Sequence, residues 1–156
     1  MESVMDVYIA DQIKNSYKLK QEIFRDNSIR GLISKISFEA IKTLKNKGKI
    51  LIAGNGGSAS DAQHIAGELV SKFFIDRDAL ASVALTTDTS VITAIGNDYG
   101  FENIFSRQIQ SIGNQGDVFI AISTSGNSEN IIKALRECKE KKIITVGLSG
   151  DTGGKM

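Results

Sequence analysis

The sequence predicts an α/β protein of three layers, in which a mainly parallel sheet lies between helices and a helical pair precedes the sheet. From residue 49 onward, short apolar runs alternate with helical patterns, as in βαβ units. These runs are continuous rather than alternating, which is typical of parallel strands buried on both faces. Two of the runs end in Gly/Ser/Asn-rich turns that open a helix, as ligand-binding loops of parallel α/β folds do.

The first 48 residues show helical spacing of their apolar side chains. The pattern covers residues 5–24 and resumes over 29–44, before Gly48. Such a helical pair can cover the sheet or form an interface between subunits, and the amphipathic pattern alone does not separate the two.

The remaining elements follow one another without a linker. We expect four strands, at 50–53, 81–85, 118–122 and 143–148. We expect helices near 58–74, 89–95, 101–112 and 128–142. The chain is therefore expected to form a single domain over 1–156, with helices over 1–48 and an α/β core over 49–156. The last strand runs into a glycine-rich segment where another helix should begin, so we expect the core to lack its carboxyl-terminal strand and helix.

Composition excludes several classes of protein. Nineteen basic and 18 acidic residues nearly cancel, so nothing favours a nucleic-acid partner. No apolar run reaches the length of a membrane span, and the first residues do not resemble a signal peptide, so we expect no membrane partner. The one cysteine, Cys138, falls in a helical pattern; this fits a packing role in a reducing cytoplasm.

The two polar loops are the most informative motifs. The first is Gly-Asn-Gly-Gly-Ser at 54–58, and the second is Ser-Thr-Ser-Gly-Asn-Ser at 123–128. Glycines let a ligand approach the backbone, while hydroxyls and the free amides of a helix start can bind an anion. The alternative is structural: Ser58 would cap one helix, and one hydroxyl of the second loop would cap the other. Two such loops favour a phosphate-bearing metabolite.

Two further motifs are weaker by themselves. His64 and Glu68 stand four residues apart on the helix after the first loop, so they share a face. The pair could bind a metal or move a proton, or it could be a solvated polar edge beside a buried stripe that includes Phe73. The segment Gly-Asn-Asp-Tyr-Gly at 96–100 is expected to form a polar turn.

Together these segments resemble the sugar isomerase (SIS) domain family and, within it, the phosphoheptose isomerases. The resemblance rests on 54–58, on Asp-Ala-Gln-His-Ile-Ala-Gly-Glu-Leu at 61–69, on 96–101, and on 116–128. It implies a flavodoxin-like SIS fold assembled as a homotetramer, with sites shared between subunits, in the cytoplasm.

The resemblance also implies roles for individual residues. The substrate would be bound by Asn55, Gly56, Gly57, Ser58, Glu68, Asn97, Asp98, Ser123, Thr124, Ser125 and Ser128. His64 and Glu68 correspond to zinc ligands, and Glu68 also corresponds to the catalytic carboxylate. The family's remaining ligands, a Gln and a second His, have no counterpart in this chain, and two ligands do not complete a zinc site.

The expected activity is the isomerisation of D-sedoheptulose 7-phosphate to D-glycero-D-manno-heptose 7-phosphate through an enediol(ate), for lipopolysaccharide or capsule heptose synthesis. A carboxylate such as that of Glu68 can move the proton between adjacent carbons. The alternatives are a non-catalytic SIS protein that senses a sugar phosphate or associates with the DnaA initiator, and an isomerase of a smaller sugar phosphate.

Overall fold

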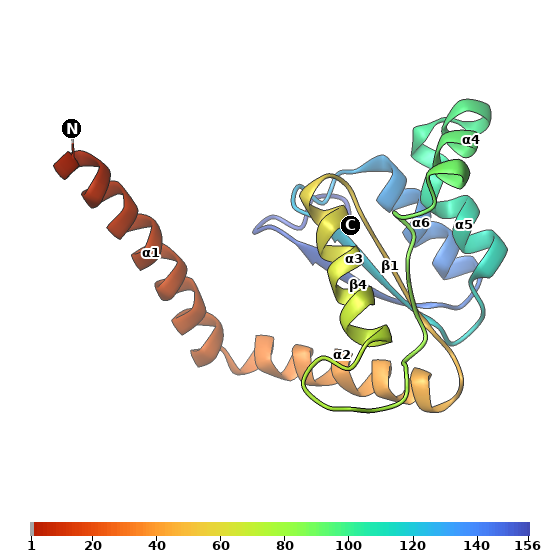
Figure 1. The fold of residues 1–156 in the computed structure, drawn as a ribbon, viewed down its shortest axis with the longest axis horizontal. Helices are drawn as coiled ribbons and strands as arrows, with labels where there is room; N and C mark the ends of the chain where they lie inside the picture. The colour runs from red at the N-terminus through yellow and green to blue at the C-terminus, as the bar shows by residue number, and fades with distance from the viewer. Residues whose placement is uncertain (1) are drawn as a thin grey trace. The chain divides into compact units, whose positions relative to one another are not determined.

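The computed structural model describes residues 2–156, which divide into two compact units, Met1–Phe38 and Glu39–Met156 (Figure 1). The first unit holds α1 (Glu2–Arg25) and the start of α2 (Asn27–Lys45). The predicted helical pair is therefore confirmed. Within the first unit, α1 exposes large apolar side chains such as Tyr8, Ile13 and Tyr17.

The second unit is built on a four-stranded sheet in which every neighbouring pair of strands is parallel. The strands are β1 (Ile50–Gly54), β2 (Ser82–Ala84), β3 (Val118–Ser123) and β4 (Ile144–Ser149), in the order β2-β1-β3-β4. The register pairs Gly54 with Ile122 across β1 and β3, and Ser123 with Ser149 across β3 and β4. The predicted α/β class with a parallel sheet is confirmed.

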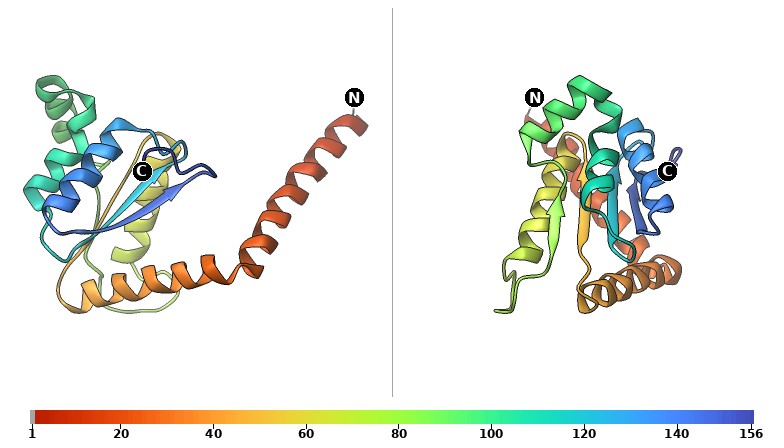
Figure 2. Two further views of the ribbon diagram at one scale, coloured as in Figure 1. Left: turned by 180° about the vertical axis from the view of Figure 1, so that it is seen from behind. Right: turned by 90° about the vertical axis from the view of Figure 1, so that its right-hand side faces the viewer.

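Helices cover both faces of this sheet. α3 (Gly57–Val70) packs on β1 and β2, while α6 (Glu129–Glu140) packs on β3 and β4. α5 (Ile104–Ile112) packs against α6 on the face opposite α3 (Figure 2). α4 (Thr89–Tyr99) and a 3-10 turn, η1 (Phe101–Asn103), connect β2 to α5. The three predicted layers are therefore present.

The core lies around the two central strands. Leu51, Ile52, Phe119 and Ala121 are fully buried, as continuous apolar strands between two helical layers require. The thiol of Cys138 also lies in this core, as predicted, and burial raises its pKa to about 12.

A buried ion pair fastens the end of the sheet at which β1 and β3 begin. Asp117 is 1% exposed; its carboxylate accepts hydrogen bonds from the backbone amides of Lys49 and Asn114. The Nζ atom of Lys49 lies 2.7 Å from Asp117 Oδ2. The charge is thus paired and hydrogen-bonded, which is the condition for burying a carboxylate without a large penalty.

Three local predictions are wrong. The segment 96–99 is helical rather than a turn, because Ile92 and Ile95 continue to pack against the core and α4 ends only at Gly100, where φ is 88°. Phe73 is exposed rather than part of a buried stripe, because α3 ends at Val70. Burial on both faces holds for β1 and β3 but not for the edge strands β2 and β4, where Val83 is 38% and Leu148 is 45% exposed.

No helix of residues 2–156 combines the length and the apolar character needed to cross a bilayer.

Candidate functional site

The strand order creates a crevice between β1 and β3. From β1 the chain moves outward to β2, and it then returns past β1 to form β3. The loops that follow β1 and β3 therefore leave in opposite directions, and the space between them is where open parallel sheets bind ligands. The two polar loops predicted from the sequence are these two loops.

The structure brings both loops together around one hollow of about 220 Å³. From the first loop and the start of α3 come Asn55 and Ser58; from the end of β3 and the second loop come Ile122, Ser123, Thr124, Ser125 and Ser128. Hydroxyl groups thus dominate its lining. A hollow of this size and polarity suits a phosphate group and the carbon that carries it.

Two helices begin at this hollow without a side-chain cap. The cap position of α3 is Gly56, which has no side chain, and that of α6 is Ser128, whose side chain does not bond the helix start within the described residues. By contrast, Asp88 caps α4, accepting a hydrogen bond from the Val91 amide at 2.9 Å. The capping role considered for Ser58 is therefore wrong, because Ser58 lies inside α3. At the start of α3 the amides of Ser58 and Ala59 already donate to the carbonyls of Asn55 and Gly56. The two helix starts therefore offer an anion their positive dipole ends and the amides that remain.

The hydroxyls of the second loop bond to one another and to their own loop. Ser123 and Ser128 lie with their Oγ atoms 3.0 Å apart, and the amide of Asn127 donates to Ser125 Oγ at 3.2 Å. Thr124 and Ser125 are exposed. Each hydroxyl keeps further hydrogen-bonding capacity, so the cluster can turn its donors toward a dianion.

Residues near the end of the chain shape this loop. The Gly150 amide donates to the Thr124 carbonyl, and the Lys155 amide donates to the Gly126 carbonyl, each at 2.9 Å. Gly126 has φ of 64°, and a Cβ atom there would overlap the Gly153 carbonyl oxygen. Only glycine fits this position, because both the backbone conformation and the neighbouring chain exclude a side chain.

One residue that supports the site, Asn130, was not predicted from the sequence. Its side chain is 3% exposed and forms two hydrogen bonds with the side-chain amide of Asn55, in both directions and each at 2.9 Å. The pair joins the first loop to the start of α6. A signal existed: Asn130 stands four and eight residues before Ala134 and Cys138, so it is an amide on the buried face of an apolar helix.

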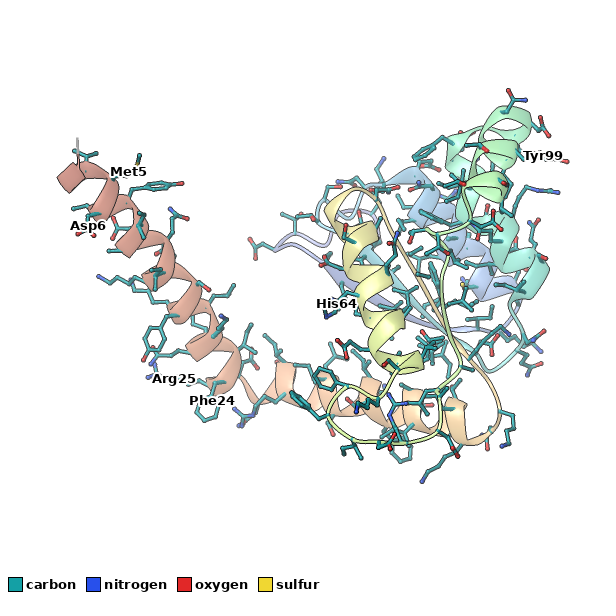
Figure 3. The ribbon with its side chains drawn as sticks, in the orientation of Figure 1. Met5, Asp6, Phe24, Arg25, His64 and Tyr99 are labelled. Atoms are coloured by element: carbon teal, nitrogen blue, oxygen red, sulfur yellow. The ribbon has the colours of Figure 1, made fainter. Side chains whose placement is uncertain are left out.

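His64 and Glu68 lie farther along α3. His64 projects outward from the helix (Figure 3), and its Nε2 atom lies 3.5 Å from Glu68 Oε1, with 75% and 38% of the two side chains exposed. Neither residue is part of the hollow's lining. Glu68 is ten residues beyond Ser58, which is about 15 Å along the helix axis.

As a metal site this pair is incomplete. An imidazole and a carboxylate are both zinc ligands, and their four-residue spacing puts them on one face of α3. Across residues 2–156, however, no group of three His, Cys, Asp or Glu side chains could hold a metal ion. Even a catalytic zinc site takes three protein ligands. The described residues of this chain therefore do not by themselves complete a zinc site.

Asn97 and Asp98 are not brought to the hollow either. Both are exposed on the last turn of α4, where Asn97 Nδ2 donates to Asp98 Oδ1 at 2.8 Å. Gly56 borders a second, smaller hollow of about 180 Å³ that shares Asn55 with the first and is otherwise largely apolar. Gly57, the first residue of α3, is exposed, and the position that a Cβ atom would take there is open space.

The chain is similar to known proteins of one family. The SIS domain model matches residues 11–150. A phosphoheptose isomerase of Aneurinibacillus thermoaerophilus is 60% identical over 97% of this chain and 77% of its own length. Phosphoheptose isomerase 2 of Campylobacter jejuni is 59% identical, over 97% and 76%. The solved structure of a phosphoheptose isomerase from Neisseria gonorrhoeae superposes with a TM-score of 0.87 at 43% identity, covering 97% of this chain and 78% of that one.

Proposed function

This chain belongs to the SIS domain family, among the phosphoheptose isomerases, and on that premise we propose that it converts D-sedoheptulose 7-phosphate to D-glycero-D-manno-heptose 7-phosphate. It is an aldose-ketose isomerase that serves heptose synthesis. The main support for a sugar phosphate as the substrate is the hydroxyl-lined hollow between two uncapped helix starts. It offers donors to a phosphate without requiring a fixed cation.

Substrate binding and proton transfer would take place in two different parts of the structure. The hollow would bind the 7-phosphate, through Ser123, Thr124, Ser125 and Ser128, and so orient the sugar for reaction. Glu68 would carry the proton between the first and second carbons, because its carboxylate accepts a proton from one carbon and returns it to the other through an enediol(ate). Asn55, Gly56, Gly57, Ser58, Asn97 and Asp98 would contact the remaining sugar.

Proton transfer by Glu68 is tested with the heptulose phosphate in D₂O. The wild-type protein should incorporate solvent deuterium at the carbon next to the carbonyl, and Glu68→Gln should not, because an amide cannot accept the proton. Phosphate binding by the variant, measured calorimetrically, is the control that its fold and hollow are intact. Full exchange by Glu68→Gln would remove Glu68 from the mechanism; no exchange by the wild type would remove the proposed reaction.

For zinc, we propose that His64 and Glu68 contribute two ligands and that the others come from outside the described residues of this chain. Their donor types and shared helix face support this proposal. The purified protein should contain zinc by elemental analysis, and His64→Ala should lose it. Retention of the metal by that variant would exclude His64 as a ligand.

We further propose a cytoplasmic homotetramer whose sites combine residues of different subunits. Exposed apolar side chains on α1, among them Tyr8, Ile13 and Tyr17, support an interface on the first unit. The separation of the hollow from Glu68 along α3 supports a shared site. Sedimentation equilibrium should give a molar mass four times that of one chain. A monomer at micromolar concentration would contradict the proposed tetramer.

A further inference from the structure

The paired amides of Asn55 and Asn130 leave a defined hydrogen-bonding capacity at the hollow. A side-chain amide has two N–H donors and an oxygen that accepts two hydrogen bonds. The reciprocal pair uses one donor and one acceptor position of each residue. Asn55 therefore retains one N–H and one oxygen lone pair. If the oxygen and nitrogen atoms of both side-chain amides changed places, Asn55 would still retain one N–H donor and one oxygen lone pair.

Asn55 borders the space that a sugar phosphate would occupy. Asn55 is half-buried and lines both the hydroxyl-rich hollow of about 220 Å³ and the neighbouring hollow of about 180 Å³. Asn130, by contrast, is nearly inaccessible to solvent at 3% exposure and lines neither hollow. Asn55 can thus touch a ligand, whereas Asn130 can act only through Asn55.

We propose that Asn130 is a positioning residue for sugar recognition: it holds the Asn55 amide so that its remaining N–H and lone pair meet hydroxyl groups of the substrate next to the phosphate. This inference rests on the proposed function, because it takes the ligand of the hollow to be a sugar phosphate. A hydroxyl is both donor and acceptor, so adjacent hydroxyls match one N–H and one lone pair.

Loss of Asn130 has a specific consequence. The Asn55 amide would lose both of the hydrogen bonds that fix its rotation, and burial at position 130 leaves little access for water to replace them. The Asn55 side chain would then rotate and form hydrogen bonds with other groups. The serine hydroxyls and the helix starts, which would bind the phosphate, would not be affected by this rotation.

The test is calorimetric binding of two probes to the wild type and to Asn130→Leu: sedoheptulose 7-phosphate and inorganic phosphate. We expect the variant to bind the sugar phosphate about tenfold more weakly, the equivalent of one hydrogen bond of about 1.4 kcal/mol. Its affinity for inorganic phosphate should change by less than about twofold. Equal losses for both probes, or no loss for either, would overturn the inference.

Asn55→Ala separates action through Asn55 from a general effect on the fold. In that background Asn130→Leu should weaken sugar binding no further, because the group it positions is gone. Full additivity of the two changes would contradict the positioning role. If Asn130→Leu does not fold, as judged by thermal unfolding, Asn130→Ala removes the same amide without adding bulk.

Thr43→Val is the matched control. Thr43 is also buried, at 4% exposure, and its hydroxyl donates to the Gly116 carbonyl at 2.9 Å, next to Asp117 and therefore at the other end of the sheet. This variant loses a buried hydrogen bond too, but both affinities should stay at the wild-type values. Failure of the wild type to bind the heptulose phosphate would overturn the proposed function and this inference with it, whereas wild-type affinity in Asn130→Leu overturns the inference alone.

Discussion

At position 126 the serine-rich loop contacts the backbone of residues 153 and 154 so closely that there is no space for a side chain. Gly126→Ala would place a methyl group against the Gly153 carbonyl and also hold alanine at a positive φ, which costs about 1–2 kcal/mol before the overlap is counted. We expect lower stability in urea and weaker binding of inorganic phosphate, because the loop must move.

Gly116→Ala is the control for this prediction. Gly116 also has a positive φ, 87°, but nothing lies within 4 Å of the position its Cβ would take. It should therefore show the strain in urea unfolding while its phosphate affinity stays unchanged. Equal phosphate affinities for Gly126→Ala and the wild type would mean that the end segment does not shape the loop.

Cys138 allows a prediction about pH. Burial, with a smaller contribution from Glu137, raises the pKa of its thiol from 9.0 to about 12. The native protein should thus resist thiol reagents at pH 8, and a denatured control should react fully. The pKa of the thiol is higher in the folded protein than in the unfolded chain, so ionisation of the thiol favours unfolding. The stability that depends on the neutral thiol is therefore complete below pH 9 and is lost between about pH 9 and 12.

The free energy of unfolding, measured as a function of pH, tests whether stability falls as the pH rises above 9. The wild type should lose stability more steeply above pH 9 than Cys138→Ala does, since the variant has no thiol to ionise on unfolding. Identical slopes for the two proteins, or rapid labelling of the native thiol, would show that the side chain is accessible.

At the scale of elements, the side chains at the cap positions of the helices form different hydrogen bonds. Asp88 caps α4, whereas Ser128 stands at the start of α6 with its hydroxyl bonded to Ser123. Asp88→Ala should cost about 1 kcal/mol of stability. Phosphate should stabilise this variant as much as the wild type, because α4 begins away from the hollow.

Ser128→Ala should give the opposite result for phosphate. At phosphate one hundred times the wild-type dissociation constant, the wild type gains about 2.7 kcal/mol; a variant that binds tenfold more weakly gains about 1.4 kcal/mol. Denaturant unfolding with phosphate, and with chloride at equal ionic strength, measures both increments. Equal increments for Ser128→Ala and Asp88→Ala would exclude the Ser128 hydroxyl from the phosphate site.

At the scale of the whole molecule, the proposed sharing of sites makes a prediction about mixed assemblies. Glu68→Gln lacks the proposed base, and a Ser123→Ala/Ser125→Ala protein lacks part of the phosphate hollow. If one site takes its hollow from one subunit and its carboxylate from another, co-expression of the two should restore measurable isomerisation. Each variant alone is the control. Mixed assemblies as inactive as the separate variants would place the whole site within one chain.

The sequence predicted the class of fold and the hollow better than it predicted the rest of the site. Parallel strands place the loops that follow them at one edge of the sheet, so the residues of 54–58 and 123–128 could be expected at that edge. The helical pattern could have shown that Asn130 is buried, but its contact with Asn55, 75 residues away, is not encoded by any local pattern. The end of α4 was misplaced because packing of Ile92 and Ile95 prevailed over the turn preference of Asn97 and Asp98.

The central place of β1 in the sheet has a consequence for synthesis on the ribosome. β1 emerges early, yet one of its two neighbours is β3, and the ion pair that fastens them joins residues 68 positions apart. Contacts of such long sequence separation form late, because the intervening chain must first be ordered. Nascent chains that stop before β3 should therefore stay sensitive to protease, and protection should appear only after β3 has left the exit tunnel. Protection of shorter nascent chains would show that β1, β2 and α3 fold without it.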